Sequence, residues 1–572
     1  MTRTTQHGNA LGVIGPGTVG RALATAAAQA GLRVTALARD EAGAAAARTA
    51  IEAALPPAAR PHLVCTADPA ALATADLVVE AVQEDLSAKL AALATAHTVC
   101  PPHTVFATTS AALSVTELAE GTGRPDRVAG LHVLPPLAPG AAAEVVPTAH
   151  TAPTALTAVR LLVRDLGLTP VQVGDRPGRV AGLLYFAFLG RAARMYEEGY
   201  ASADQIDTAL RLGCGLPTGP LARIDELGVD TVCDALTALA AATGDRRLEP
   251  APVLRQLVRE GRLGRKSGAG FHRYAGVGTA DEPRTPALRP TGIGRVAVVG
   301  SGTMAAGIAE VCVRAGFATV ITARSEAKAE TTRSRVAASL MRATARGHIG
   351  TGEGRAALGL LSARGSLAGA AGADLVIEAV AEDTAVKETV FQELGRICRP
   401  GVVLATGTSS LPVADCATAS RRPEDVVGLH FFHPAPRMRL VEVVATPKSA
   451  PATVETAQAF ATALGKQPVL CEDRAGFVVN ALLFPYLNQA LELLGSHYAD
   501  TDVIDTVMRT GCGFPTGPFE LLDSIGLDVS LRILGHLHEA APGTHQEPSP
   551  LLAHLVRAGL TGRKPGTGLR GC

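Results

Sequence analysis

RVAVVGSGTMAAGIAEVCVRAGFATVITAR, residues 295–324, is the stretch that decides the fold. Its apolar runs and glycines predict a strand, a glycine turn, a helix and a second strand. Gly300 permits a tight turn, and Gly302 lets the backbone approach a pyrophosphate. The helix begins at Thr303 and Met304, where free N–H groups and the positive end of the helix dipole face an anion. The stretch therefore predicts a dinucleotide-binding α/β unit.

The same pattern opens the chain, with Gly15, Gly17 and Gly20 in the segment GVIGPGTVG (12–20). One glycine motif alone is weak evidence, because many such motifs are simple turns. Two of them, each at the start of a strand–helix–strand pattern, favour dinucleotide binding in both halves.

Other segments also recur, and they indicate an internal duplication. The pairs are offset by 298 residues: ADLVVEAVQEDLSAK (75–89) returns as ADLVIEAVAEDTAVK (373–387), and GCGLPTGP (213–220) as GCGFPTGP (511–518). The glycine turns are offset by only 285 residues, so the second copy holds 13 extra residues. We expect these as a polar, helical surface insertion within 330–365.

Each copy is predicted to contain an α/β Rossmann domain with a parallel sheet, followed by an all-α helical domain. A Pro/Gly/Thr-rich stretch reads as the linker between copies. In the helical part of copy 2, a helix is expected from an Asp500/Thr501 N-cap to Thr510, with Gly511 ending it. The expected boundaries are 8–174 and 175–276 for copy 1, 277–292 for the linker, and 293–472 and 473–572 for copy 2.

The composition of the 572 residues excludes several classes of protein. Hydrophobic residues make up 47% of the chain, and 53 basic residues balance 53 acidic ones, so no charge pattern suggests nucleic acid or a membrane as partner. The polar N-terminus lacks a signal-peptide core. Ten cysteines without a C-x-x-C pair argue against a disulfide framework or a structural metal site. We therefore expect a soluble, cytoplasmic protein.

The end of the second strand bears on the choice of cofactor. A dinucleotide site often has an acidic residue there, which holds the adenosine 2′-hydroxyl. This chain has Ala323 followed by Arg324, and in the first copy Ala38 followed by Arg39. Because a guanidinium can bind a 2′-phosphate, we hypothesise a preference for NADP(H) over NAD(H). The alternative is that both arginines are solvated loop residues.

The motifs of both copies resemble the 3-hydroxyacyl-CoA dehydrogenase (3-hydroxybutyryl-CoA dehydrogenase) family, duplicated in tandem. The resemblance implies a Rossmann domain followed by a helical domain that dimerises, and reversible hydride transfer between a nicotinamide and C3 of a short 3-hydroxyacyl or 3-oxoacyl thioester. In copy 2 the motifs are GSGTMA (300–305), EAVAEDTAVK (378–387), TSSL (408–411), GLHFFHP (428–434), LVEVV (440–444), AGFVVN (475–480), GFPTGPF (513–519) and GRKPGTG (562–568).

The residues suit that reaction. Reduction of a ketone builds negative charge on oxygen, so a proton donor is needed, and an imidazole titrates near neutral pH. The resemblance implies that His430 is the catalytic acid/base and that Glu442 orients it. It also implies that Ser409 and Asn480 supply the hydroxyl and amide donors around the reacting oxygen.

Further roles follow from the same resemblance. Glu382 and Lys387 correspond to residues near the nicotinamide ribose. His433 stands where the family has Asn, which is a departure from the family motif, and Arg439 stands where the family tends to have a basic residue.

The first copy keeps only part of this set. His132 and Glu144 match the acid/base pair, whereas Ala111 and Gly182 replace the two supporting donors. Loss of one such donor commonly costs about 10²–10³ in rate, so we predict a weak or inactive site. Ser110 would rescue one contact if its loop shifted.

Several alternatives stay open. The acyl group is carried by CoA, or by an acyl carrier protein, or the substrate is a free hydroxy acid. A different class is a binding or scaffold protein in which both sites have decayed. The two copies are expected to form an internal pseudo-dimer, with a further homodimer as the alternative.

Overall fold

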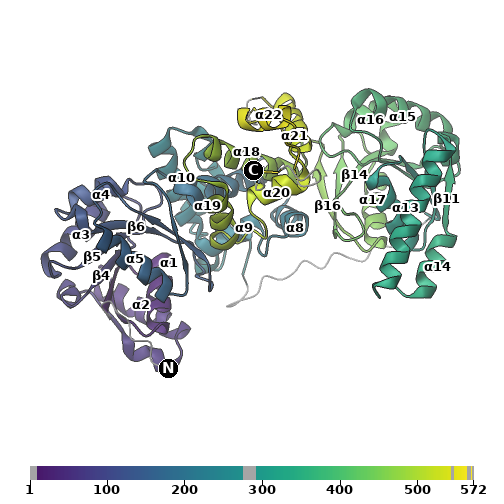
Figure 1. Ribbon diagram of the computed structural model, residues 1–572. Coiled ribbons are helices and arrows are strands. Elements are labelled where there is room, and N and C mark those ends of the chain that lie inside the picture. The colour runs from purple at the N-terminus through teal and green to yellow at the C-terminus, as the bar shows by residue number, and fades with distance from the viewer. Residues whose placement is uncertain (1–9, 275–291, 543–546, 563–567, 570–572) are drawn as a thin grey trace.

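Each half of the chain folds around an eight-stranded sheet (Figure 1). The computed structural model describes residues 10–274, 292–542, 547–562 and 568–569, so the expected linker, apart from Gly292, lies outside the described residues. The strand orders are β3-β2-β1-β4-β5-β6-β7-β8 and β11-β10-β9-β12-β13-β14-β15-β16. Six strands of each sheet follow the Rossmann order 3-2-1-4-5-6, which confirms the predicted fold class.

The central strands are short apolar runs that are buried on both faces, as expected for a sheet covered by helices, whereas the strands at the edges of each sheet are partly exposed. In the first sheet they are β1 Ala10–Ile14, β2 Arg33–Leu37, β3 Leu63–Thr66, β4 Leu77–Glu80, β5 Val105–Thr108, β6 Val128–His132, β7 Ala142–Val146 and β8 Thr169–Gln172. In the second they are β9 Arg295–Val299, β10 Ala318–Thr322, β11 Leu361–Arg364, β12 Leu375–Glu378, β13 Val403–Thr406, β14 Val426–Phe431, β15 Leu440–Ala445 and β16 Gln467–Glu472.

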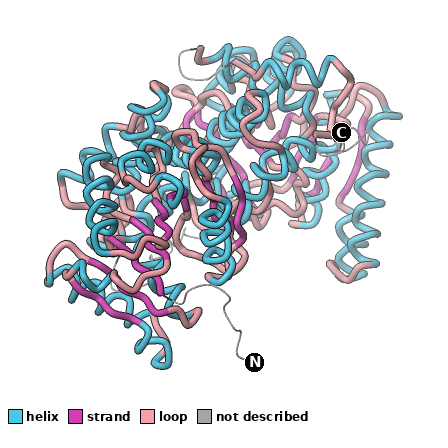
Figure 2. Tube along the Cα trace, turned by 60° about the vertical axis from the view of Figure 1, so that its left-hand side comes forward, coloured by secondary structure: helices cyan, strands magenta, loops and turns pink. Residues whose placement is uncertain are grey.

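Helices enclose both groups of strands (Figure 2). Those of the first Rossmann domain are α1 Thr18–Gln29, α2 Glu41–Ala54, α3 Leu86–Val99, α4 Val115–Gly121 and α5 Pro153–Asp165. Those of the second are α12 Thr303–Arg314, α13 Glu326–Ala345, α14 Thr351–Gly359, α15 Thr384–Ile397, α16 Val413–Ala419 and α17 Pro451–Ala463.

The remainder of each copy is helical. Copy 1 contributes α6 Arg179–Ala181, a π-helical turn Gly182–Phe186, α7 Ala187–Glu197, α8 Ala203–Cys214, α9 Pro220–Leu227, α10 Val229–Thr243 and α11 Pro252–Arg259. Copy 2 contributes α18 Val479–Gly495, α19 Thr501–Thr506, a π-helical turn Val507–Gly511, α20 Pro518–Ile525, α21 Leu527–Ala540 and α22 Pro550–Arg557. Among the described residues, none of these helices is long and apolar enough to cross a bilayer.

The prediction of an all-parallel sheet is wrong for the last two strands. β7 runs antiparallel to β6, and β15 runs antiparallel to β14, while the final strand of each sheet is parallel to its neighbour. The connections 133–141 and 432–439 contain no helix, so they are too short for a parallel crossover.

The insertion lies where it was expected. Between β10 and β11, copy 2 has the helices α13 and α14, whereas copy 1 has the shorter α2 and one 3₁₀ turn before β3. The long α13 starts at a Ser325 N-cap, whose hydroxyl accepts the Lys328 N–H at 3.3 Å.

The predicted end of α19 at Gly511 is wrong. Asp500 does cap the helix by accepting the Val503 N–H at 2.8 Å. The chain then widens into a π-helical turn, and the left-handed glycine is Gly513, with φ +80°. Gly511 serves another purpose, because a Cβ there would lie 3.2 Å from the carbonyl oxygen of Ala142 in the other copy.

The two helical domains pack against each other between the Rossmann domains, which lie at opposite ends of the molecule in Figure 1. Equivalent contacts occur twice: the Arg176 guanidinium lies over the Tyr498 ring, and Arg474 over Tyr200. Positions 191 and 489, which are themselves equivalent, meet each other, with Arg191 donating to Gln489 at 2.9 Å. This pattern is that of a two-fold axis inside one chain.

Aromatic rings form the centre of this internal interface. Phe514 stacks on Tyr486 of its own copy at 4.8 Å between ring centroids. It also meets the edges of two rings of copy 1, Phe188 at 5.5 Å and Tyr185 at 6.1 Å. The contact between copies is therefore a continuous hydrophobic core.

Candidate active site

The glycine turn after β9 has the shape that a bound dinucleotide requires. Gly300 has φ +143°, and a Cβ there would collide with the carbonyl oxygen of Ala379. A Cβ on Gly302 would meet no atom within 4 Å, so this side of the turn is open. No side chain caps the following helix α12, which begins at Thr303 and continues with Met304. Its first N–H groups are thus free to bind phosphates.

The first copy keeps the same turn. Gly15 has φ +84°, and a Cβ on Gly20 would collide with the Gly15 carbonyl. No side chain caps α1 after Gly17. Both turns therefore fit the pyrophosphate of a dinucleotide.

The arginines proposed to select the cofactor are exposed. Arg324 lies between the end of β10 and the start of α13, directly after Ala323. Arg39 occupies the same place in copy 1, where its side chain is 96% exposed and lies 3.8 Å from the carboxylate of Asp40.

His430 and Glu442 form a buried pair at the carboxyl edge of the second sheet. The two residues are direct partners across the antiparallel strands β14 and β15, which explains why a spacing of twelve brings them together. His430 Nδ1 lies 2.6 Å from Glu442 Oε2, and both side chains are almost fully buried.

Glu442 is held in place from the helical domain. Its Oε1 accepts the backbone N–H groups of Val478 and Val479 at 3.0 and 2.9 Å. With the carboxylate as acceptor, the imidazole carries its proton on Nδ1 and leaves Nε2 for a substrate. The rings of Phe432 and Phe477 pack against the imidazole, with centroids 4.5 and 5.6 Å away.

Ser409 and Asn480 contact each other, and Asn480 directly follows Val479, whose N–H binds Glu442. The Asn480 amide donates to the Ser409 carbonyl oxygen at 3.0 Å, so it fixes the loop that carries the serine. Glu382 holds the same loop: its Oε1 accepts the Ser409 N–H at 2.7 Å and the Thr408 hydroxyl at 2.6 Å. The Ser409 hydroxyl lies 3.3 Å from the same oxygen.

Lys387 is buried in an ion-pair network whose central member is Glu378, a residue that was not among the predicted site residues. Lys387 Nζ lies 2.9 Å from both oxygens of Glu378 and 3.3 Å from Glu382. Burial lowers the pKa of Lys387, but the two carboxylates outweigh it and leave the pKa above its usual value. Burial raises the pKa of Glu382, but the charge of Lys387 and the loop hydrogen bonds hold it below its usual value. Because Glu80, Glu84 and Lys89 repeat the network in copy 1, it belongs to the fold of both sites.

A second histidine reaches the same loop. His536 of α21 lies 2.9 Å, through Nδ1, from the Ser410 hydroxyl. Copy 1 has Ala238 and Ala112 at these positions, so the contact occurs only in copy 2. One signal in the sequence could have indicated this residue, because polar side chains occupy both positions in only one of the two copies. His433, by contrast, is exposed on the connection between β14 and β15.

The first copy keeps the pair and loses its surroundings. His132 Nδ1 lies 2.7 Å from Glu144 Oε2, and Glu144 accepts two backbone N–H groups as Glu442 does. Ser110 donates to Glu84 at 2.5 Å, which is the role of Thr408 in copy 2, so the idea that it replaces Ser409 is not supported.

Arg179 takes the place of Phe477. Both residues have the same left-handed backbone, with φ of +50° and +51°. The Arg179 side chain is fully buried and donates to the Ser110 carbonyl oxygen at 2.6 Å. Copy 1 thus has a guanidinium where copy 2 has a ring packed on its histidine.

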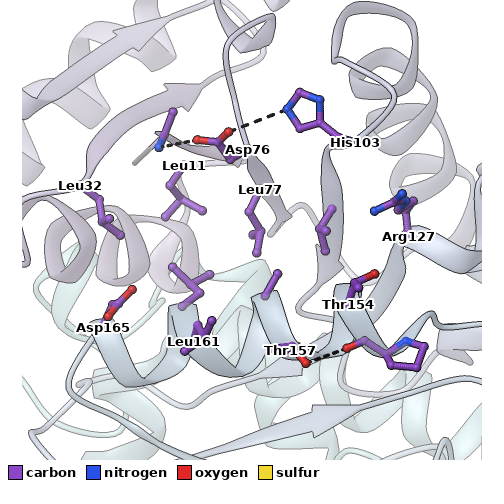
Figure 3. A pocket seen from close by; sticks show the side chains of 15 residues that line it. Leu11, Leu32, Asp76, Leu77, His103, Arg127, Thr154, Thr157, Leu161 and Asp165 are labelled. Carbon is purple, nitrogen blue, oxygen red and sulfur yellow. Dashed lines mark hydrogen bonds and ion pairs between the residues drawn. The ribbon is translucent and has the colours of Figure 1, made fainter. Parts of the chain in front are cut away.

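A cavity of about 430 Å³ in copy 1 lies away from this site (Figure 3). Leu11, Leu77 and Val105 line it from the starts of parallel strands, while Asp76 and His103 face each other across 3.9 Å at its rim. Because cofactors bind at the carboxyl ends of such strands, this cavity at the amino edge is not part of the candidate site.

The fold and the site together define a nicotinamide-dependent oxidoreductase. The family model of the 3-hydroxyacyl-CoA dehydrogenase NAD binding domain matches residues 10–176 and 295–474 of the sequence. The family model of the 3-hydroxyacyl-CoA dehydrogenase C-terminal domain matches residues 180–274 and 476–570. The chain belongs to the 3-hydroxyacyl-CoA dehydrogenase family, in tandem duplicate, which confirms the resemblance seen in its motifs.

Known proteins resemble this chain in sequence and in structure. A 3-hydroxybutyryl-CoA dehydrogenase of Mycobacterium tuberculosis is 43% identical over 278 residues, which are 48% of this chain and 97% of that protein. The human mitochondrial hydroxyacyl-coenzyme A dehydrogenase is 44% identical over 196 residues, 34% of this chain and 62% of that protein. The solved structure of a 3-hydroxybutyryl-CoA dehydrogenase from Escherichia coli shares the fold over 97% of this chain and 99% of its own, with a TM-score of 0.64 and 24% identity.

Proposed function

We propose that the second copy interconverts short 3-hydroxyacyl and 3-oxoacyl thioesters, and that the first copy is weak or inactive. One observation carries this proposal. The buried histidine–glutamate pair occurs in both copies, but only copy 2 adds Ser409 and Asn480 next to it. The name of the Mycobacterium tuberculosis relative supports 3-hydroxybutyryl-CoA as the type of substrate.

The residues of copy 2 account for the proton in this reaction. Oxidation removes a hydride from C3 and a proton from its hydroxyl; a bound nicotinamide supplies the hydride chemistry. His430 Nε2 accepts the hydroxyl proton, and Glu442 stabilises the imidazolium that forms. In the reverse direction His430 returns the proton to the oxygen of the ketone. Ser409 and Asn480 orient the loop beside that oxygen, where donors stabilise developing charge.

The low activity expected of copy 1 follows from the residues around its histidine–glutamate pair. A buried guanidinium at Arg179 and a glycine at 182 replace the ring and the amide of copy 2. Removal of a preorganised donor commonly costs about 10²–10³ in rate, and copy 1 lacks both donors. Its glycine turn is intact, so we expect copy 1 to keep the ability to bind a nucleotide.

Matched histidine variants test this assignment. His430→Ala should lower kcat with acetoacetyl-CoA by about 10²- to 10⁴-fold, because it removes the acid/base group. His132→Ala should change kcat less than twofold, which makes it the control. The measurement is the absorbance of NADPH and of NADH, with 3-oxoacyl groups on CoA, on an acyl carrier protein and as free acids. Major loss in His132→Ala alone would reverse the assignment, and no turnover of any substrate would favour a binding protein.

We also propose a preference for NADP(H). Arg324 is exposed at the end of β10, and the preceding position is Ala323 in place of a carboxylate that would repel a 2′-phosphate. Wild type should therefore have a higher kcat/KM with NADPH than with NADH. Arg324→Gln should lower the NADPH value about tenfold and leave the NADH value within twofold, while Arg39→Gln serves as the control in copy 1. A clear NADH preference of wild type would contradict the proposal.

A further inference from the structure

A hollow of about 340 Å³ on the second Rossmann domain is lined by cations and, among its described lining residues, by no carboxylate. It lies between the end of α12, the connection from β14 to β15, and the end of α17. Its charged side chains are Arg314, Arg437, Arg439 and Lys466.

Lys466 lines this hollow and is held in place by backbone carbonyl groups. Its Nζ donates to the carbonyl oxygens of Ala435 and Met438, both at 2.7 Å. The ammonium is thus fixed inside the connection that joins the strand of His430 to the strand of Glu442. Burial, followed by the charge of Arg314, lowers the pKa of Lys466. An anion in the hollow would relieve this repulsion.

The guanidinium groups of the three arginines are available to bind an anion. Arg437 and Arg439 are exposed, and no ion pair or hydrogen bond of either guanidinium occurs in the described parts of the chain. Arg314 lies 3.8 Å from Glu310, a long ion-pair distance. Guanidinium groups bind phosphate oxygens in a forked geometry, and several of them around one hollow strengthen this attraction.

The first copy is an internal control for the role of these cations. The equivalent positions there are Gln29, Pro139, Ala141 and Leu168, none of which is charged. The surrounding strands keep the same order in both copies. The fold therefore does not need the cations, which occur only in the copy with the complete site.

We propose that this hollow binds a phosphate-bearing anion. The inference goes beyond the proposed function, because hydride and proton transfer use none of the four cations. Two sources share this chemistry: the phosphate groups of the thioester's own carrier, and a separate phosphorylated metabolite. In either case the anion lies on the connection between the two strands of the catalytic pair.

Titration calorimetry of the full chain with inorganic pyrophosphate tests the site. NADH and NADPH are present at saturating concentration and occupy the glycine turns, so pyrophosphate binding at those turns does not contribute to the measured heat. We expect one pyrophosphate per chain, and a Kd at least tenfold higher in Arg437→Gln/Arg439→Gln. Both arginines are exposed, so this variant should keep the Tm of wild type. Arg342→Gln/Arg355→Gln removes two exposed charges from α13 and α14, and its Kd should stay within twofold.

The outcomes separate cleanly. Equal Kd values for wild type and Arg437→Gln/Arg439→Gln, or no binding heat with wild type, would overturn the proposal. Free CoA that displaces pyrophosphate identifies the thioester's carrier as the source, whereas simultaneous binding identifies a separate metabolite. His430→Ala should bind pyrophosphate as wild type does, so failure of the anion site is distinguishable from failure of the proposed enzyme activity.

Discussion

Single residues explain how one fold yields two different sites. The histidine–glutamate pair has nearly the same distance in both copies, 2.6 and 2.7 Å. The two copies differ in the residues around this pair. Copy 2 has Asn480 and Phe477, where copy 1 has Gly182 and Arg179. Acid/base chemistry needs the pair, but efficient turnover also needs preorganised donors around it.

Glu442→Gln tests the role of the carboxylate in copy 2. A Gln amide group facing His430 donates to Nδ1, which moves the imidazole proton to Nε2 and removes the base. We expect kcat to fall about 10²- to 10⁴-fold, as happens when the acid of a histidine–carboxylate pair is made neutral. Steady-state kinetics measure this, with Glu144→Gln as the control in copy 1. Unchanged kcat in Glu442→Gln would show that the carboxylate does not orient the histidine.

At the scale of elements, the loop 407–411 joins the two domains of copy 2. Its residues bond to Glu382 after β12, to Asn480 in α18 and to His536 in α21. The position of Ser409 therefore depends on three elements distant in sequence.

A double-mutant cycle on Ser410 and His536 measures one of these links. Ser410→Ala and His536→Ala each remove a partly buried hydrogen bond, which contributes about 0.5–1.5 kcal/mol. We expect kcat/KM to fall about fivefold in each variant and no further in the double variant, because both remove the same contact. Additive losses would show that the two side chains act independently. Urea unfolding of the same variants reports the change in stability.

Sequence patterns predicted the elements better than their connections. The glycine turns and the alternation of strands and helices follow from local periodicity and from the repeat, whereas the pairing of His430 with Glu442 follows from the family resemblance. The reversal of β15 was missed because a strand pattern carries no direction, although the short connection 432–439 was a signal for it. Gly511 was misread as a helix end, since its packing on Ala142 of the other copy involves residues 369 positions apart. The partner of Lys387 was missed for the same reason: burial of an ion pair is a tertiary property.

At the scale of the whole molecule, the two helical domains already cover each other. Equivalent contacts between the two copies occur on both sides of the internal two-fold axis, so we propose that the protein is an internal pseudo-dimer. We expect a monomer of 58.4 kDa in sedimentation equilibrium at micromolar concentrations. A species of twice that mass would indicate a further homodimer.

Phe514→Ala tests the stability of this interface. The ring is 4% exposed and contacts both copies, so its loss leaves a cavity between them. Such a change costs about 3–5 kcal/mol in the free energy of unfolding. Urea denaturation measures it, and Phe271→Ala, whose ring packs on Tyr196 within copy 1, is the control for a cavity inside one copy. If only Phe514→Ala splits unfolding into two transitions, the interface couples the copies; two transitions in wild type would contradict that coupling.

The hydrogen bond between Arg191 and Gln489 has an evolutionary consequence. In a homodimer, a residue on the symmetry axis meets its own duplicate, so arginine would face arginine and a single mutation would change both sides at once. Fusion of two genes into one frees each side to drift alone. An unlike pair at the axis then becomes accessible by ordinary point mutation, and one half can abandon turnover while the other retains it.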